Sequence, residues 1–402
     1  MILAYPDAPC VAQGQRLRLH VCGDAPAFFI QFLRCGKSAA CTATRAVHAG
    51  QAYSQHQFAI DEDWKPGVYV AAFASQPQDA PALDARSARA LFVVRPERPS
   101  ARLLVVLPLF TYHAYNVAHV DGTLGAQEGE CLYSGAKWVS LHRPGGGTGG
   151  HPWDEVNADA YDPASPRQTF AHWDGKALAW LEQNGIAYDC CTDLELHEGC
   201  IDLHAYRALA SFGHHEYWTD AMRLRVERFV AQGGNAAFFG GNTCWFRTEY
   251  DAQRRAIHRI GRWTENPEWR FTGVTYGHGG GKWIGARPAT GYTVADPDHW
   301  VFSGTNLRAG EVFGAPERLI GYECDGAPPE SGVRVVASAS IADWPVDDGS
   351  GERSQTARAD MGVRECGGTI FTASTADWAR VLASEEPAVA RVTRNVIERF
   401  TA

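Results

Sequence analysis

The residues with the clearest potential for chemistry stand together at positions 213–218, where the sequence reads Gly-His-His-Glu-Tyr-Trp. They follow an apolar run at 209–212 that is typical of a buried strand, and Thr219 after them can cap an amphipathic helix. Turns between strand and helix lie at the carboxyl edge of an open α/β sheet, where ligands and catalytic groups collect. The pattern therefore favours a catalytic or ligand-binding turn. The alternative is a plain connection whose His and Tyr side chains cap neighbouring backbone groups.

Two further polar groups follow other predicted strands. Tyr115 and Asn116 come after an apolar run at 103–109, and Asn242 lies in a Gly-Gly-Asn-Thr-Cys-Trp turn after a strand at 235–239. We expect the three turns to converge on one edge of the sheet. Taken singly, Tyr115 is more typical of an amphipathic core residue and Asn242 of a turn former.

Several familiar chemistries are excluded by missing partners. No Gly-x-Ser-x-Gly motif accompanies the glycines at 279–281, and Gly281-Lys282 is followed by Trp283 instead of Ser or Thr. A zincin helix would need a histidine where Thr219 stands. The turn after the strand at 208–212 has no cysteine, which argues against covalent catalysis there.

The predicted secondary structure that positions these residues differs between the first hundred residues and the rest of the chain. Up to residue 98, short runs at 16–21, 28–33, 57–60, 68–73 and 90–94 are separated by Gly, Pro, Asp and Ser clusters, which predicts an antiparallel β-sandwich. This part has no chemistry-bearing cluster. Residues 95–100 contain two prolines and are typical of a linker.

Strands and helices alternate from residue 101 onward. The apolar run at 103–109 is typical of a strand buried on both faces, and closing helices are predicted near 219–232 and 387–400. Such alternation implies a mostly parallel sheet with helices on both faces. Residues 117–165 are poorly periodic and rich in glycine, so a functional loop or lid is expected there.

Composition narrows the class of protein and partner. The 402 residues are 45% hydrophobic and 21% charged, which is typical of a soluble globular protein. A net charge of −9 without a Lys/Arg cluster argues against nucleic acid and anionic membranes as partners, and favours neutral small molecules as ligands.

The beginning of the sequence lacks the pattern of a signal peptide, and no apolar run approaches about 18 residues, so we predict a cytoplasmic protein. Eleven irregularly spaced cysteines without a CxxC pair indicate reduced core thiols.

A resemblance to a known family rests on short sequence motifs that recur in the same order across residues 101–402. They are LVVLPLFTYHAYN at 104–116, GHHEYW at 213–218, GGNTCW at 240–245, GYECDG at 321–326 and GTIFTASTADW at 368–378. With these words the chain resembles the catalytic part of the N,N-dimethylformamidase large-subunit family. The resemblance implies an α/β fold class: an Ig-like, antiparallel β-sandwich at 1–98, then a mostly parallel, doubly wound sheet at 101–402. This sheet would resemble class I glutamine amidotransferases without their cysteine.

The resemblance also implies a mononuclear iron amidohydrolase that cleaves a small amide. One iron ion per chain, expected as Fe³⁺, would be held by two tyrosines and a glutamate; Tyr115 matches the first tyrosine and Glu216 the carboxylate. His214, Asn242 and Glu323 match the polar residues that act on substrate and water, with Glu323 as a general base. Hard oxygen ligands suit ferric iron, and a metal can hold a phenolate that would otherwise need a pH near 10.

The sequence departs from the family in two places. Family members commonly have Arg-Pro-Tyr where residues 143–145 read Arg-Pro-Gly, so the second phenolate is unassigned. Tyr133, His151 or Tyr161 could replace it. An acid usually precedes the family's glutamate, and His215 stands there. A homo-oligomer and a small partner subunit both stay possible.

Two alternatives accompany the amidohydrolase interpretation. A different metalloenzyme could use the same scaffold with altered ligands near Gly145, or the chain could be a binding module that has lost its metal.

Four aromatic residues lie near the turns and would narrow the pocket to compact amides: Tyr112, Tyr217, Trp218 and Trp245. Trp218 and Trp245 could equally be core residues. The glycines at 145–150 would form a mobile cover.

Overall fold

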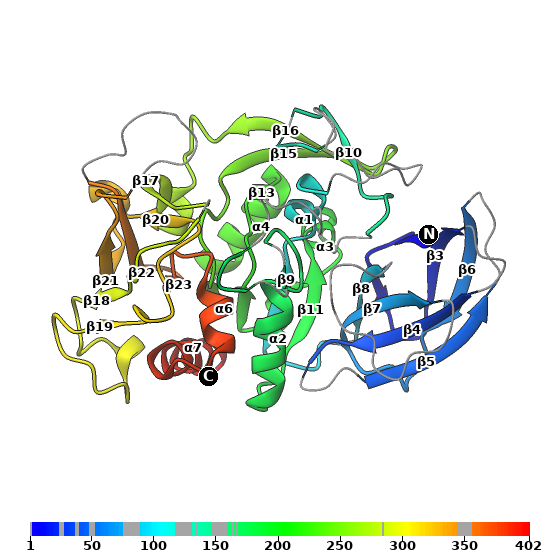
Figure 1. The fold of residues 1–402 in the computed structure, drawn as a ribbon, viewed down its shortest axis with the longest axis horizontal. Coiled ribbons are helices and arrows are strands. Elements are labelled where there is room, and N and C mark those ends of the chain that lie inside the picture. Colours follow the sequence, from blue (N-terminus) through cyan, green and yellow to red (C-terminus); the bar gives the residue numbers. More distant parts are fainter. Residues whose placement is uncertain are drawn as a thin grey trace. The chain divides into compact units, whose positions relative to one another are not determined.

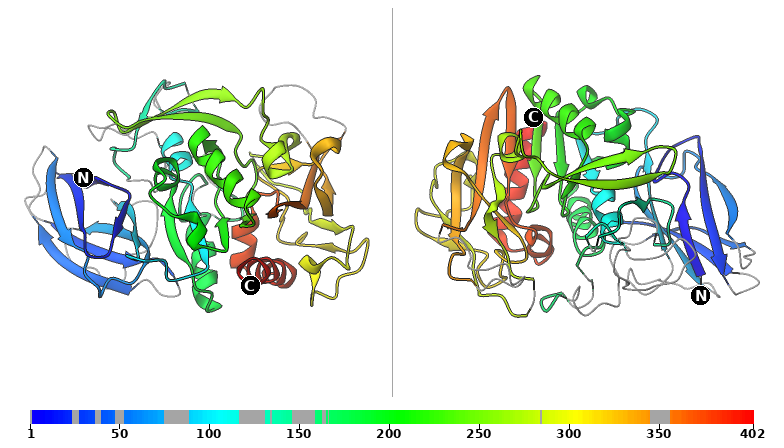
Figure 2. Two further views of the ribbon diagram at one scale, coloured as in Figure 1. Left: turned by 180° about the vertical axis from the view of Figure 1, so that it is seen from behind. Right: turned by 90° about the horizontal axis from the view of Figure 1, so that it is seen from above.

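Figures 1 and 2 show the fold of the computed structural model. The chain divides into two compact units. The first contains residues 1–101, 106–201 and 248–260, and the second contains 102–105, 202–247 and 261–402. The structure describes residues 2–23, 28–36, 40–47, 53–74, 89–116, 131–133, 135–145, 159–162, 165, 167–283, 285–344 and 356–402.

Two sheets make up the first hundred residues. One has the order β1 (Ile2–Pro6), β3 (Arg16–Gly23), β6 (Ser54–Ala59). The other has the order β2 (Cys10–Ala12), β8 (Arg89–Arg95), β7 (Gly67–Ala74), β4 (Phe28–Arg34), β5 (Ala40–Val47). All of their described pairs are antiparallel except β2 with β8.

The two sheets share one apolar core because side chains alternate along each strand. In β3, Leu17 and Leu19 are buried while Arg16 and Arg18 are exposed. Phe32 from the other sheet meets three aromatic rings edge-on, at centroid distances of 5.0–6.0 Å: Phe58, Trp64 and Phe92. The short alternating runs therefore build the sandwich that the sequence predicts.

The remaining elements of the first unit are short. They are α1 (Leu109–Ala114), β10 (Val139–Ser140), α2 (Asp174–Gln183), β11 (Asp189–Thr192) and α3 (Asp193–Glu198). Helix α3 begins at a capping box, in which Thr192 accepts from the Leu194 N–H and the Glu195 carboxylate accepts from the Thr192 N–H.

The largest sheet has the order β11-β9-β12-β14-β23-β22-β21-β18-β19. Strands β9 (Leu103–Leu107), β12 (Ala208–Ser211), β14 (Asn235–Phe238) and β23 (Gly368–Thr372) are parallel neighbours. Strands β22 (Arg358–Cys366), β21 (Arg334–Ser340), β18 (Tyr292–Val294) and β19 (Val312–Phe313) continue the sheet with antiparallel pairs.

The prediction of a mostly parallel sheet is therefore wrong for this half of the sheet. Between β22 and β23 only Gly367 intervenes, and its φ of 97° makes the tight turn. A parallel neighbour would need a crossover of a dozen or more residues. The sheet is mixed, and a resemblance to class I glutamine amidotransferases stays a prediction.

Helices cover both faces of the parallel half. On one face, Phe238 lies 5.6 Å from Phe271 of α5 (Trp269–Thr272). On the other face, Phe371 lies 6.4 Å from Trp378 of α6 (Trp378–Ala383). Trp378 also donates to Thr393 of α7 (Pro387–Thr401) over 3.0 Å. Because Phe371 pairs with the residue before Phe238, the two rings point to opposite faces.

The remaining elements belong to the second unit, except that β15 and β16 include residues 248–260 of the first unit. They are η2 (Leu203–Ala205), β13 (Tyr217–Trp218), α4 (Asp220–Ala231), β15 (Phe246–Asp251), β16 (Ala256–Arg262), β17 (Thr275–Gly280), η3 (Trp300–Phe302), β20 (Cys324–Gly326) and η4 (Pro329–Ser331). None of the helices in the described ranges is long and apolar enough to span a membrane. Ten of the eleven cysteines have described side chains, and these are not in disulfide bonds.

Helix α4 begins where the sequence predicts, and its cap can be tested. The Thr219 hydroxyl accepts from the Met222 N–H over 3.3 Å. We expect Thr219→Ala to lower the free energy of unfolding by about 0.5–2 kcal/mol, because one helical N–H loses its acceptor. Thr219→Ser keeps the acceptor and should stay close to the wild type in urea unfolding. Equal losses in both variants would contradict a capping role.

Candidate functional site

Four of the five predicted site residues meet in the second unit. His214 Nε2 lies 2.7 Å from Glu323 Oε2 and 3.8 Å from Glu216 Oε2. Asn242 Nδ2 donates to Glu216 Oε1 over 3.1 Å and to Glu323 Oε2 over 3.2 Å. All four side chains are buried. The predicted convergence of the turns at 213–218 and 240–245 is therefore present, and Glu323 joins them from the residue before β20.

Glycine at two positions allows this close approach. A Cβ on Gly241 would lie 2.4 Å from the Glu323 carbonyl oxygen, and one on Gly240 would lie 2.6 Å from the Gly213 carbonyl oxygen. Asn242 has a φ of 53°, in the left-handed region that asparagine tolerates better than most residues. The glycines of the Gly-Gly-Asn motif thus let the backbone at 240–242 lie close to the backbone at Gly213 and at Glu323.

Asp325 anchors the Asn242 turn, and the sequence analysis missed it. Its two carboxylate oxygens accept from the Asn242 N–H over 3.0 and 2.9 Å. Burial raises the pKa of Asp325 to about 8, helped by the negative charges of Glu268 and Glu323 and opposed by the hydrogen bond from Asn242. Asp325 therefore positions Asn242.

Asp377 anchors the segment before β20 that carries Glu323. Its carboxylate accepts from the Tyr322 N–H over 2.6 Å and contacts Arg287 Nη2 at 3.0 Å and Arg380 Nε at 2.8 Å. Burial alone would raise the pKa of Asp377, but the guanidinium groups of Arg287 and Arg380 outweigh it and lower the pKa to about 2. A buried, ionised Asp377 thus fixes the backbone next to Glu323.

The cluster holds a histidine that is protonated at neutral pH. Burial disfavours the charged imidazole, but the carboxylates of Glu323 and Glu216 outweigh it and raise the pKa of His214 to about 9. The close pair of His214 and Glu323 can therefore accept and return a proton. The Asn242 Oδ1 atom is buried and has no hydrogen-bond partner among the described residues.

Tyr115 belongs to the first unit, at the C-terminal cap of α1. Its ring lies 5.6 Å from that of Tyr133. The departure from the family is nearby, because Asn116 Nδ2 donates to the Pro144 carbonyl over 2.9 Å. Tyr133 and Tyr161 both stay open as the replacement phenol. His151 lies outside the described residues.

The four aromatic residues predicted to narrow the pocket are all buried: Tyr112, Tyr217, Trp218 and Trp245. Trp218 is fully buried between Phe238 and Phe271, and its Nε1 donates to the His215 carbonyl over 2.9 Å, so it is a core residue. Trp245 is also buried and contacts Tyr276 at a centroid distance of 5.3 Å. The predicted glycine cover lies outside the described residues from position 146 onward.

Comparison with known proteins places the chain in a family. Residues 36–391 match the family described as N,N-dimethylformamidase beta subunit-like, C-terminal. The N,N-dimethylformamidase beta subunits of Paracoccus aminophilus and of Alcaligenes sp are each 25% identical over 273 residues, which cover 56% of this chain and 36% of each relative. The chain belongs to the N,N-dimethylformamidase beta subunit-like family. It spans about a third of the length of these relatives.

Solved structures give weaker matches. The β-galactosidase of Bacillus circulans sp. alkalophilus has a TM-score of 0.33 at 15% identity, over 56% of this chain and 26% of that one. The cold-adapted β-galactosidase of Rahnella sp. R3 has a TM-score of 0.34 at 11% identity, over the same shares. At these values neither structure bears on the site.

Proposed function

We propose that this chain is an amidohydrolase that cleaves the C–N bond of a small amide, such as an N-substituted formamide. The buried pair of His214 Nε2 and Glu323 Oε2, 2.7 Å apart, supports the proposal most directly. Membership of a family named after N,N-dimethylformamidase supports the substrate class. Burial of the cluster favours a compact amide over a peptide.

The residues of the cluster can divide the reaction between them. Glu323 is the general base that takes a proton from the attacking water, and His214 is the acid that returns a proton to the departing amine. The Asn242 amide donates to both carboxylates, which holds them apart and oriented. Burial of all four side chains excludes bulk water and strengthens these interactions.

Iron is part of the proposal, with Tyr115 and Glu216 as the residues that would hold it. Among the described residues, no group of three or more His, Cys, Asp or Glu side chains is arranged to hold a metal ion. The donor chemistry fits, because the Glu216 carboxylate and the unpartnered Asn242 Oδ1 are hard oxygen donors. When bound, ferric iron would supply Lewis acidity at the amide carbonyl and the attacking water.

Substrate class is tested with a panel of amides and purified protein. Formamide, N-substituted formamides, acetamides and dipeptides should be assayed side by side for amine release. We expect the compact formamides to be cleaved best, because the cluster is buried. Dipeptides as the best substrates would overturn the compact-amide proposal. Because the relatives are named as beta subunits, the panel should also be run on any complex that co-purifies.

Tyr115 as an iron ligand has a spectroscopic consequence. The iron-loaded protein should show a visible charge-transfer band from tyrosinate to iron, and Tyr115→Phe should weaken or remove it while unfolding stays cooperative. Tyr133→Phe tests the neighbouring ring in the same way. A colourless, metal-free preparation with full amidase activity would contradict the iron assignment.

One observation favours a second candidate, a binding module without metal. Gly145 stands where the family commonly has a tyrosine. If the second phenolate is absent, metal analysis of the purified chain should find less than one iron per chain, and amides should bind without turnover.

A further inference from the structure

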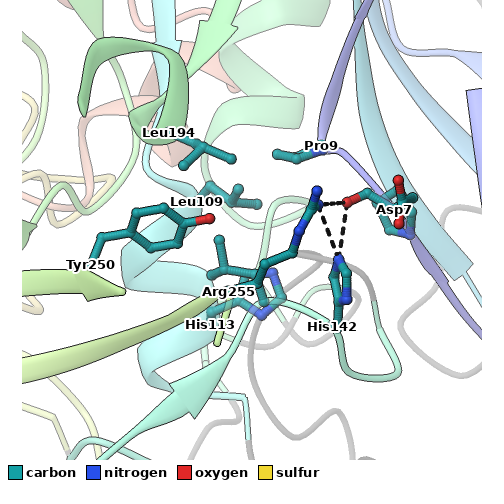
Figure 3. Close-up of a pocket in the computed structure, with 10 residues that line it drawn as sticks. Asp7, Pro9, Leu109, His113, His142, Leu194, Tyr250 and Arg255 are labelled. Atoms are coloured by element: carbon teal, nitrogen blue, oxygen red, sulfur yellow. Dashed lines mark hydrogen bonds between the residues drawn. The ribbon is translucent and has the colours of Figure 1, made fainter. Parts of the chain in front are cut away.

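The first unit contains a pocket of its own (Figure 3). It encloses about 290 Å³ together with its open mouth. Its walls are largely apolar, with Leu109 from α1, Leu141 after β10 and Leu194 from α3. A largely apolar lining with few polar groups suits a small ligand.

Arg255 places a positive charge in this pocket, and no carboxylate among the described residues pairs with it. Its Nη1 donates to the Asp7 carbonyl and lies 3.2 Å from His142 Nε2, and it forms no ion pair within the described ranges (Figure 3). The Asp7 carboxylate is engaged elsewhere, 3.2 Å from His20 Nε2 and 3.9 Å from Arg18 Nη1. A partly buried guanidinium beside apolar walls favours an anionic ligand.

Two more polar groups face the same space. His113 is 2% exposed and lines the pocket, and its Nδ1 has no hydrogen-bond partner in the part of the chain that the structure describes. Such an unmet donor or acceptor costs free energy unless a ligand or water meets it. Tyr250 directs its hydroxyl into the pocket (Figure 3), and its ring stacks on Phe110 at 5.8 Å.

We propose that this pocket binds a small monocarboxylate of the size of formate or acetate. One carboxylate oxygen would accept from Arg255, and the other from Tyr250 or from His113 with its proton on Nδ1. The apolar walls suit a hydrogen or a methyl group on the carboxyl carbon. A dianion would leave a second charge buried without a partner, so inorganic phosphate should bind poorly.

Titration of the full chain with sodium formate tests the proposal. Binding is followed by calorimetry and by ¹³C-formate line broadening at constant ionic strength, with sodium phosphate and sodium chloride as comparisons. We expect saturable formate binding that Arg255→Gln weakens at least about tenfold, because it removes a charge-assisted hydrogen bond. Arg254→Gln is the matched control, since that neighbouring arginine pairs with Asp251 and lies outside the pocket lining. It should bind formate like the wild type.

Two further variants keep the result interpretable. Tyr250→Phe removes one hydroxyl and should weaken formate binding severalfold even if Arg255→Gln proves unstable. Glu323→Gln should leave this binding unchanged, which separates the pocket from any formate held at the proposed amide site. Unchanged binding in both Arg255→Gln and Tyr250→Phe, or phosphate binding as tight as formate, would overturn the proposal.

Discussion

Replacing Glu323 by Gln should lower turnover of the best amide by about 10² to 10⁴, because a general base typically contributes that much. Gln keeps the shape of the side chain but cannot take a proton from water. Asn242 Nδ2 and His214 Nε2 would both lose a charged neighbour at 3.2 and 2.7 Å. The measurement is kcat and KM on the best formamide, with metal content determined on the same sample.

The companion variant Glu216→Gln should behave differently. A neutral amide is a poor ligand for a hard cation, so Glu216→Gln should lose iron, whereas Glu323→Gln should retain it. Glu330→Gln is the matched control, because Glu330 is exposed in η4. Equal metal loss in Glu216→Gln and Glu323→Gln would show that the two roles are wrongly divided.

Replacing Asp377 by Asn should be among the most destabilising single changes. It leaves the Arg287 guanidinium, only 3% exposed, without its carboxylate, which typically costs about 3–5 kcal/mol of unfolding free energy. Urea unfolding followed by circular dichroism measures the loss. Because Asp377 holds the Tyr322 N–H, turnover should fall as well, even at temperatures where the variant stays folded.

Asp377 also predicts how stability depends on pH. Its pKa is lowered to about 2 in the folded protein, below the ordinary value of 3.8. A lowered pKa means that its contribution is fully present above about pH 4 and is lost as the pH falls towards 2. Asp377→Asn should remove this part of the acid dependence. Asp298→Asn, at an exposed position, is the control, and an unchanged acid profile in Asp377→Asn would contradict the assignment.

Three residues of the candidate site can be predicted from the sequence, because the order of neighbouring parallel strands determines where they lie. Apolar runs ending at Ser211 and Phe238 are parallel neighbours, so the turns that follow them must share one sheet edge. His214, Glu216 and Asn242 lie in those turns. Glu323 was assigned through family resemblance alone, because no strand order known from the sequence brings β20 to this edge.

The supporting residues could not be predicted, because their roles come from distant contacts. Asp325 binds a backbone N–H 83 residues away, and Asp377 binds one 55 residues away. The signal available in the sequence was their place inside the words GYECDG and TADW. Asp7 has no such signal in the sequence, because residues up to 98 contain no chemistry-bearing cluster. Its carbonyl accepts from Arg255, 248 residues away.

The mixed sheet was missed for a different reason. The predicted alternation of strand and helix does not include strands at 334–340 and 358–366. The prediction of parallel strands therefore covers a part of the sheet that is antiparallel. The single-residue connection at Gly367 shows why the pattern stops there. The sandwich core, the Thr219 cap of α4 and the extent of α7 follow from local patterns and agree with the structure.

Hydrolysis in ¹⁸O-labelled water tests the central claim most directly. The purified, metal-loaded chain is incubated with an N-substituted formamide, and the carboxylate and amine products are quantified by mass spectrometry. If the cluster of His214, Glu216, Asn242 and Glu323 hydrolyses amides, amine and ¹⁸O-labelled formate should appear in equal amounts, and both should fall by about 10² or more in Glu323→Gln. Amide that binds but yields no amine, or product formation unaffected by Glu323→Gln, would contradict the claim.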